Sequence, residues 1–334
     1  MIGDFVNVNR LLKLASMVGI SGTEDAVSDY IKTELENLNF TCEKDSFGNL
    51  FAHRNGSGKH LLLEAHIDQV GMMVSEIDSQ GFIRFSPVGG IDLRILPSQE
   101  VFIHGKSITR GTICFHPSDD SENTDKAPSL NRLCIDTGLG ARVAEVVSVG
   151  DFVSFNSVPF VQNGHVFGAA LDNRASVEIL LSCLEANETD LEVSVLFAVQ
   201  EEIGHIGAIV AEPRINADLA IVLDVTFGQS HNDNKDTFVC GNGPAIGVGP
   251  SVSHKDALEL IDVAKKTGVQ HQIEVMGGSS GTDAWTMQLA GNGLPVVMVS
   301  LPIRYMHTPV EQFDLQDAEA AVTLLNAYFK RCAQ

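Results

Sequence analysis

Residues 61–68 read Leu61-Leu62-Leu63-Glu64-Ala65-His66-Ile67-Asp68, a short apolar run that ends in the polar residues His66 and Asp68. An apolar run of this length after a loop-like stretch, here Asn55-Gly56-Ser57-Gly58, is typical of a buried strand. His66 and Asp68 then lie at the carboxyl end of that strand. In open α/β sheets, ligands bind just beyond the carboxyl ends of the strands. The stretch therefore predicts an α/β sheet with a site at this edge.

The same arrangement recurs along the chain. Further strand candidates at 192–199, 219–223 and 294–299 each lead to acidic residues or a histidine, and one more aspartate opens a helical pattern after residue 170. Because the carboxyl ends of parallel strands share one edge, we expect these side chains to gather there. The expected set is His66, Asp172, Glu202, Asp224 and His307, with Asp68 and Glu201 as neighbours.

Two imidazoles and three carboxylates form a set of nitrogen and oxygen donors. Such a set suits zinc, cobalt or manganese, whereas carboxylates alone would indicate calcium or magnesium. Five ligands exceed what one tetrahedral ion needs, so two divalent ions that share a bridging carboxylate fit the number better. Two ions about 3.5–4 Å apart are a known hydrolytic arrangement.

The neighbouring residues suggest supporting roles. Glu201 and Glu202 are adjacent and cannot project identically, so one can bind metal while the other acts as a general base toward water. Asp68, two residues after His66, suits acceptance of the free imidazole N–H. Each of these residues taken singly is also typical of a solvated loop, a turn or a helix cap. The prediction rests on their conjunction at the ends of strands.

Two features stay open from the sequence. Thr282 and Asp283 follow a small-residue loop, and they fit either a substrate-facing loop or a simple helix cap. The histidines outside the ligand set are interpreted as structural or solvent-exposed. His205 is the first exception to consider among them, because it is close in sequence to the pair of glutamates.

The middle of the chain has a different texture. From residue 71 to about 164, helical periodicity disappears and short β-like runs alternate with turns, which predicts an inserted all-β domain. A polar loop is expected at 118–129 and a short helix at 141–147. The α/β core then consists of residues 1–70 and 165–334.

Composition narrows the classes of function. The chain has 334 residues, 44% of them hydrophobic, and a net charge of −21, so we expect a globular protein that repels nucleic acid and anionic membranes. Its six cysteines include no Cys-x-x-Cys pair, which argues against a cysteine zinc site and against a dense disulfide scaffold. The sequence contains no run of about 18 apolar residues, so it predicts no membrane-spanning helix. A cytoplasmic location is the simplest interpretation.

With these residues in hand, the sequence resembles the tetrahedral (TET-type) aminopeptidases, also called glutamyl or deblocking aminopeptidases, a family of dinuclear metallopeptidases. The similarity extends in order over nearly the whole chain. One position departs from the family pattern, since Asn173 stands where a second Asp is usual. The matching stretches are 65–71, 88–92, 170–174, 199–204, 223–226, 281–284 and 304–311.

The resemblance implies a three-layer α/β/α metallopeptidase core. It also implies that His66 and Asp224 hold one metal, that Glu202 and His307 hold the other, and that Asp172 bridges them. Glu201 would be the general base, and Asp68 would orient His66. The inserted domain, residues 71–164 and β-barrel-like, would mediate dimers that assemble into a hollow dodecamer. Peptides would enter its cavity and be trimmed from a free amino end.

The sequence therefore predicts a cytoplasmic dinuclear metallo-aminopeptidase with two zinc or cobalt ions, or manganese, per chain. One alternative is an amide deacylase that uses the same metal centre on acylated or sugar-derived substrates. Another is a non-catalytic assembly protein on this scaffold. Glu201 and the complete ligand set argue against the second alternative, because binding alone requires neither.

Overall fold

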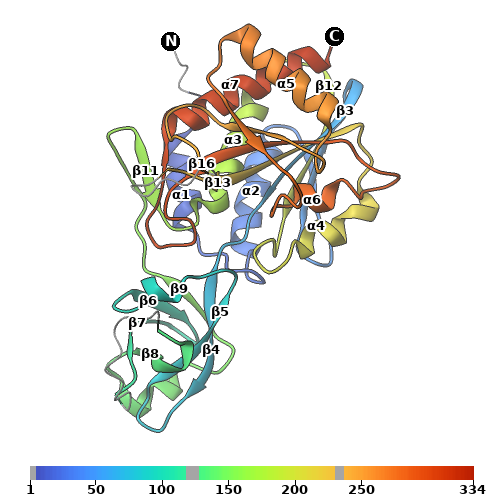
Figure 1. The fold of residues 1–334 in the computed structure, drawn as a ribbon. Helices are drawn as coiled ribbons and strands as arrows, with labels where there is room; N and C mark the ends of the chain where they lie inside the picture. The colour runs from blue at the N-terminus through green and yellow to red at the C-terminus, as the bar shows by residue number, and fades with distance from the viewer. Residues whose placement is uncertain (1–4, 118–127, 230–236) are drawn as a thin grey trace.

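The computed structural model describes residues 5–117, 128–229 and 237–334. They form an α/β core and a smaller β barrel that lies below it in Figure 1. Most of the polar loop expected at 118–129 lies outside the described residues. Within the described part of the chain, no helix combines the length and the apolar character that crossing a membrane would require.

One sheet of eight strands forms the centre of the core. Its order is β1 (Thr41–Lys44), β2 (Leu50–Arg54), β12 (Leu191–Ala198), β3 (Ser57–His66), β13 (Leu219–Phe227), β16 (Val296–Ile303), β14 (Ala245–Val248) and β15 (Gln272–Val275). The central strands β12, β3, β13 and β16 are parallel, so their carboxyl ends meet at one edge. The strand predicted from residues 61–68 is β3. It begins earlier than expected, because Ser57 pairs with Leu191 of β12.

Helices cover both faces of this sheet, which gives the expected three layers. On one face lie α1 (Val8–Ser16), α2 (Asp25–Asn37), α3 (Leu171–Ala186), α5 (His254–Thr267) and α7 (Leu315–Cys332), and on the other lie α4 (Ile206–Ala211) and α6 (Ala284–Met287). The two apolar clusters divide β3 by alternation: Leu61 and Leu63 face the first group, and Leu62 faces the second.

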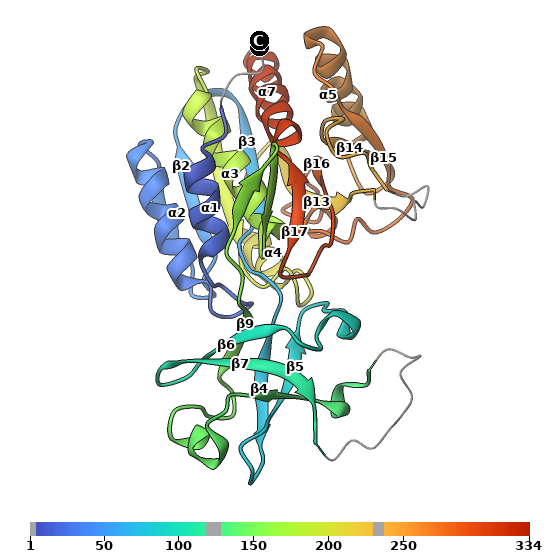
Figure 2. The same ribbon diagram turned by 90° about the vertical axis from the view of Figure 1, so that its left-hand side faces the viewer.

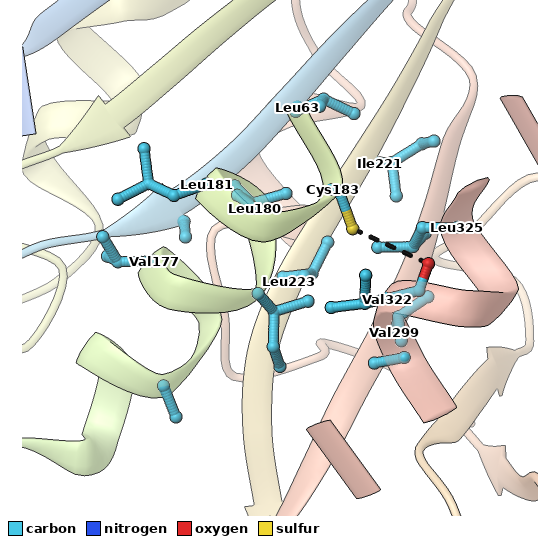
Figure 3. Packing of buried hydrophobic residues seen from close by; sticks show 14 of the residues in the cluster. Leu63, Val177, Leu180, Leu181, Cys183, Ile221, Leu223, Val299, Val322 and Leu325 are labelled. Carbon is cyan, nitrogen blue, oxygen red and sulfur yellow. Dashed lines mark hydrogen bonds between the residues drawn. The ribbon is translucent and has the colours of Figure 1, made fainter. Parts of the chain in front are cut away.

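Helix α3 packs on the sheet beside α7, as Figure 3 shows, and α1 also contacts it. Leu180 lies among apolar side chains of β3 and β13, and the Cys183 thiol donates a hydrogen bond to the carbonyl of Val322 on α7. Because α3 is buried along nearly all of its length, its first turn is held firmly against the sheet edge. That turn carries Asp172.

The inserted strands close into a barrel. Its order is β4 (Gly71–Ile77), β5 (Ile83–Val88), β8 (Leu133–Asp136), β7 (Ile108–Phe115), β6 (Glu100–His104) and β9 (Phe152–Phe155). Its interior is a separate apolar cluster that includes Met72, Phe85 and Val101. Figure 2 shows it joined to the core through the chain before β4 and after β9. The predicted fold class, an α/β core with an inserted all-β domain, is confirmed.

Short elements complete the structure. The helix expected at 141–147 is the 3-10 helix η3 (Gly140–Glu145), and the others are η1 (Leu93–Ile95), η2 (Leu130–Arg132) and η4 (Glu212–Arg214). A three-stranded sheet of β10 (Phe160–Gln162), β11 (His165–Gly168) and β17 (Glu311–Asp314) was not expected from the sequence. It places Glu311 opposite Gly168, just before α3.

Candidate metal centre

The predicted site residues reach one cavity from the carboxyl edge of the parallel strands. His66 ends β3, Asp224 lies in the adjacent β13, and the two glutamates Glu201 and Glu202 follow β12. His307 is on the loop after β16, and the aspartate of the first turn of α3 completes the wall. These six side chains line a cavity of about 510 Å³.

Asp172 lies between the two histidines. Its Oδ1 is 3.2 Å from Nε2 of His66, and its Oδ2 is 3.2 Å from Nε2 of His307. Each histidine has one more carboxylate beside the same nitrogen: Asp224 at 3.5 Å from His66, and Glu202 at 3.2 Å from His307. The five residues therefore form two adjoining half-sites with Asp172 common to both.

Asp68 lies behind this group and is fully buried. Its Oδ1 is 3.3 Å from Nδ1 of His66 and accepts the backbone N–H of Glu201 at 2.9 Å. Its Oδ2 accepts the hydroxyl of Ser21 at 2.6 Å and the backbone N–H of Glu202 at 3.2 Å. Asp68 thus fixes the ring of one histidine and the backbone of both glutamates.

The donor set fits divalent cations. Nδ1 of His307 is 2.7 Å from the carbonyl of Gly90, so in the neutral ring that would bind a cation this nitrogen carries the proton and Nε2 has the lone pair. That lone pair faces oxygens of Asp172 and Glu202, and one oxygen of Glu202 is buried with no hydrogen-bond partner among the described residues. Three lone-pair donors that face one another require positive charge between them. Imidazole and carboxylate are ligands that zinc, cobalt and manganese accept.

The shifts in pKa show how negative this cavity is. Burial would lower the pKa of His307, but the carboxylates of Asp172 and Glu202 raise it to about 11. Burial raises the pKa of Glu202 to about 7, and the charge of Asp172 adds to that shift. The negative charges of these carboxylates are therefore not fully balanced by the protein, and a bound cation would balance them.

Comparison with known proteins places this site in a family. The family described as M42 glutamyl aminopeptidase matches residues 48–324. The chain belongs to the M42 glutamyl aminopeptidase family. It is 30% identical over 337 residues to a lysyl aminopeptidase of Pyrococcus furiosus, with 96% of each chain covered. The predicted resemblance and the prediction of an aminopeptidase, a hydrolase, are confirmed at this level.

Solved structures of other peptidases agree with this assignment. An aminopeptidase from the archaeon Desulfurococcus kamchatkensis aligns with a TM-score of 0.90 at 30% identity, over 99% of this chain and 95% of that one. The TET1 peptidase of Pyrococcus horikoshii, described as assembling into a tetrahedron or a large octahedral shell, aligns with a TM-score of 0.84 at 30% identity, over 96% and 98%.

The structure adds His205 to the M42 site. Its Nδ1 lies 2.8 Å from Oε1 of Glu201 and 3.3 Å from Oδ1 of Asp283. The contacts with Asp283 and Glu201 raise the pKa of His205 to about 10, and burial raises the pKa of Glu201 to about 8. The helix-cap alternative is wrong for the side chain of Asp283, which makes no capping hydrogen bond to α6, but the Thr282 hydroxyl accepts the backbone N–H of Ala284 at 3.3 Å. The only sequence signal was the spacing of His205 from the glutamate pair.

Glu311 is a second residue that the sequence analysis missed. It is 2% exposed, its Oε2 accepts the backbone N–H of Asp172 at 3.0 Å, and its Oε1 accepts that of His307 at 2.8 Å. One buried carboxylate therefore ties together two segments that carry predicted ligands. Asn173, the departure from the family pattern, donates from its amide to the carbonyl of Leu223 at 2.9 Å. This bond holds the start of α3 against β13.

Proposed function

We propose that this M42 aminopeptidase removes N-terminal residues from peptides with two divalent ions and a glutamate general base. The observation that carries the proposal is the position of Asp172, whose two oxygens each lie 3.2 Å from Nε2 of a different histidine. A carboxylate placed in this way suits a bridge between two ions. His66, Asp172 and Glu202 each offer one ligand atom within 4.8 Å of the others, which supports the assignment of this cavity to metal.

In this proposal His66 and Asp224 would hold one ion, Glu202 and His307 would hold the other, and Asp172 would bridge them. Zinc or cobalt suits the donors, and manganese also does. When bound, such ions polarise the substrate carbonyl and lower the pKa of water. Asp68 would keep His66 in the tautomer that presents Nε2 to the cavity, as its 3.3 Å distance from Nδ1 favours.

Glu201 would move the proton. It lines the cavity, its side chain is 9% exposed, and its backbone N–H is held by Asp68. Its carboxylate would take the proton from the attacking water and deliver it to the amine nitrogen as the scissile C–N bond breaks. Burial raises the pKa of Glu201 to about 8, close to the neutral range in which a group can both accept and return a proton.

The same proposal covers assembly and location. The inserted domain, residues 71–164, would mediate dimers that build a dodecamer. The TET1 peptidase of Pyrococcus horikoshii, a relative of similar fold, can assemble into a tetrahedron or a large octahedral shell. Ile108 and Val149 on the barrel are 69% and 64% exposed, which favours a contact surface there. The six cysteines are free thiols, the form kept in the reducing cytoplasm.

Replacement of Glu201 by Gln tests the chemistry. Gln keeps the size of the side chain but cannot take a proton, so kcat on aminoacyl chromogenic substrates should fall by about 10²–10⁴-fold. Metal content, measured by mass spectrometry on the same samples, should stay near that of the wild type, because Glu201 is not among the proposed ligands.

Turnover at the wild-type rate in Glu201→Gln would remove Glu201 from the mechanism. A wild-type enzyme that binds two metals but hydrolyses only acylated amides would shift the substrate to that class instead. Loss of metal together with activity in the variant would make Glu201 a ligand, contrary to the proposed division of roles.

A further inference from the structure

Two histidines and a glutamate meet on the face of the sheet that carries α4, well away from the catalytic cavity. His53 of β2 is directly opposite Ser194 of β12, and His60 of β3 is beside Glu192 of β12. Since successive side chains alternate between faces, Glu192 and Ser194 project to the same side. His60 is six residues before the metal-centre end of β3, so the cluster is about 20 Å from that end.

The three side chains point at one another. Oε1 of Glu192 is 3.6 Å from Nε2 of His53 and 3.8 Å from Nδ1 of His60. One ligand atom from each residue lies within 4.8 Å of the others. Tetrahedral zinc with bonds of about 2.0–2.2 Å places its nitrogen and oxygen ligands about 3.3 Å apart. The two distances to Glu192 exceed that by only a few tenths of an ångström, and side-chain rotation can bring the two ring nitrogens, within 4.8 Å of each other, to the same spacing.

Ser194 orients both rings from behind. Its hydroxyl oxygen is 3.0 Å from Nδ1 of His53 and 2.8 Å from Nε2 of His60. A hydroxyl oxygen has two lone pairs, so it can accept an N–H from each ring. The opposite nitrogens, the ones beside Glu192, then carry lone pairs directed at the carboxylate. This is the orientation that metal-binding histidines have when a polar group holds the other ring nitrogen.

We propose that His53, His60 and Glu192 bind a divalent transition-metal ion of the zinc class, separate from the catalytic centre. The side-chain oxygen of Asn55 lies 3.2 Å from Nε2 of His53 and offers a fourth donor. Two imidazoles with one carboxylate are a zinc-type ligand set. The ion would join β2, β12 and β3, three adjacent strands of the central sheet.

The surroundings suit a cation. The cluster opens on a cavity of about 250 Å³, and the His53 and Glu192 side chains are 38% and 35% exposed, so an ion can enter from solvent. Burial lowers the pKa of His60, which keeps the ring neutral and able to bind metal at neutral pH. Arg214 also lines the cavity, but its guanidinium pairs with Glu43 and lies over the ring of Phe51.

The test uses the full-length enzyme equilibrated with excess zinc and then freed of unbound metal. Zinc per chain is measured for the wild type, for His60→Gln and for the matched control His271→Gln, which removes a partly exposed histidine from another part of the core. His60→Gln should contain one zinc less per chain than the wild type, and the control should contain the same number. Activity on aminoacyl substrates should not differ among the three.

The position of the ion is read directly from crystals of the zinc-loaded wild type by anomalous scattering at the zinc edge. A peak between His53, His60 and Glu192 is expected. Equal zinc content in the wild type and in His60→Gln, with no such peak, would overturn the proposal. If His60→Gln folds poorly, Glu192→Gln decides in its place, and an undiminished zinc content there has the same meaning.

Discussion

At the scale of single residues, His205 is predicted to set the working pH of Glu201. Burial raises the pKa of Glu201, and the ion pair with His205 at 2.8 Å opposes that shift. In His205→Leu the opposing charge is gone, so the pKa of Glu201 should rise and more alkaline conditions should be needed to form the base. The acidic limb of the kcat/KM profile should therefore move to higher pH.

The profile is measured on one aminoacyl substrate, with metal content followed in parallel. His271→Gln is again a suitable control, since its ring contacts the backbone of Val269 and no predicted site residue. An unchanged acidic limb in His205→Leu would mean that the ion pair does not tune Glu201. Fully lost activity with lost metal would instead mark His205 as a structural support.

Whether a site residue could be predicted depends on whether the sequence near it already indicates its role. His66 and Asp224 could be predicted because a short apolar run in the sequence already places a strand end beside them. Glu311 could not, since its role depends on hydrogen bonds to the backbone of Asp172 and His307. For His205 the sequence offered only its short separation from the glutamate pair, because its second partner, Asp283, lies far along the chain. Contacts of this kind exist only after folding.

At the scale of elements, a buried ion pair joins α1 to α3, the helix that carries Asp172. Arg10 binds both oxygens of Glu178, through Nε at 2.6 Å and Nη2 at 3.0 Å, and the two side chains are 2% and 0% exposed. Arg10→Met leaves the Glu178 carboxylate buried without its partner. The free energy of unfolding should fall by about 3–5 kcal/mol in urea titrations at neutral pH.

The deficit should shrink in acid. Burial raises the pKa of Glu178, and loss of Arg10 raises it further, so protonation removes the unpaired charge as the pH falls. Lys32→Met is the control, because Lys32 and Glu36 form an exposed pair at 3.7 Å that should contribute only about 0.5 kcal/mol or less. Equal losses in the two variants would contradict the role of burial.

Elements with strong periodicity were the predictable ones. The apolar run at 61–63 marks β3, a long strand whose second half is buried. The sheet of β10, β11 and β17 has strands of three or four residues, and its pairing joins Gly168 to Glu311 across the chain. Strands of three or four residues are too short to show a periodic pattern in the sequence. Their pairing could not be predicted either, because the partner strand is distant in sequence.

At the scale of the whole molecule, the net charge of −21 makes chains repel one another at long range. The self-association proposed above would therefore rest on short-range apolar contact. Ile108 and Val149 are 69% and 64% exposed on the inserted barrel, where they have no role in its interior. Apolar side chains of this size on an acidic surface are the places where association would overcome the repulsion.

The double variant Ile108→Glu/Val149→Glu should therefore separate the chains. Light scattering after size exclusion should give a multiple of 35.9 kDa for the wild type and 35.9 kDa itself for the variant. Each chain should keep its fold and its metal, because exposed substitutions change stability by only about 0.5 kcal/mol. Val275→Glu is the control, because it puts a charge on an 83% exposed residue of β15, which belongs to the α/β core and not to the barrel. Chains of this variant should remain at least dimeric. If the barrel variant keeps the full wild-type mass, Ile108 and Val149 do not form the contact between chains.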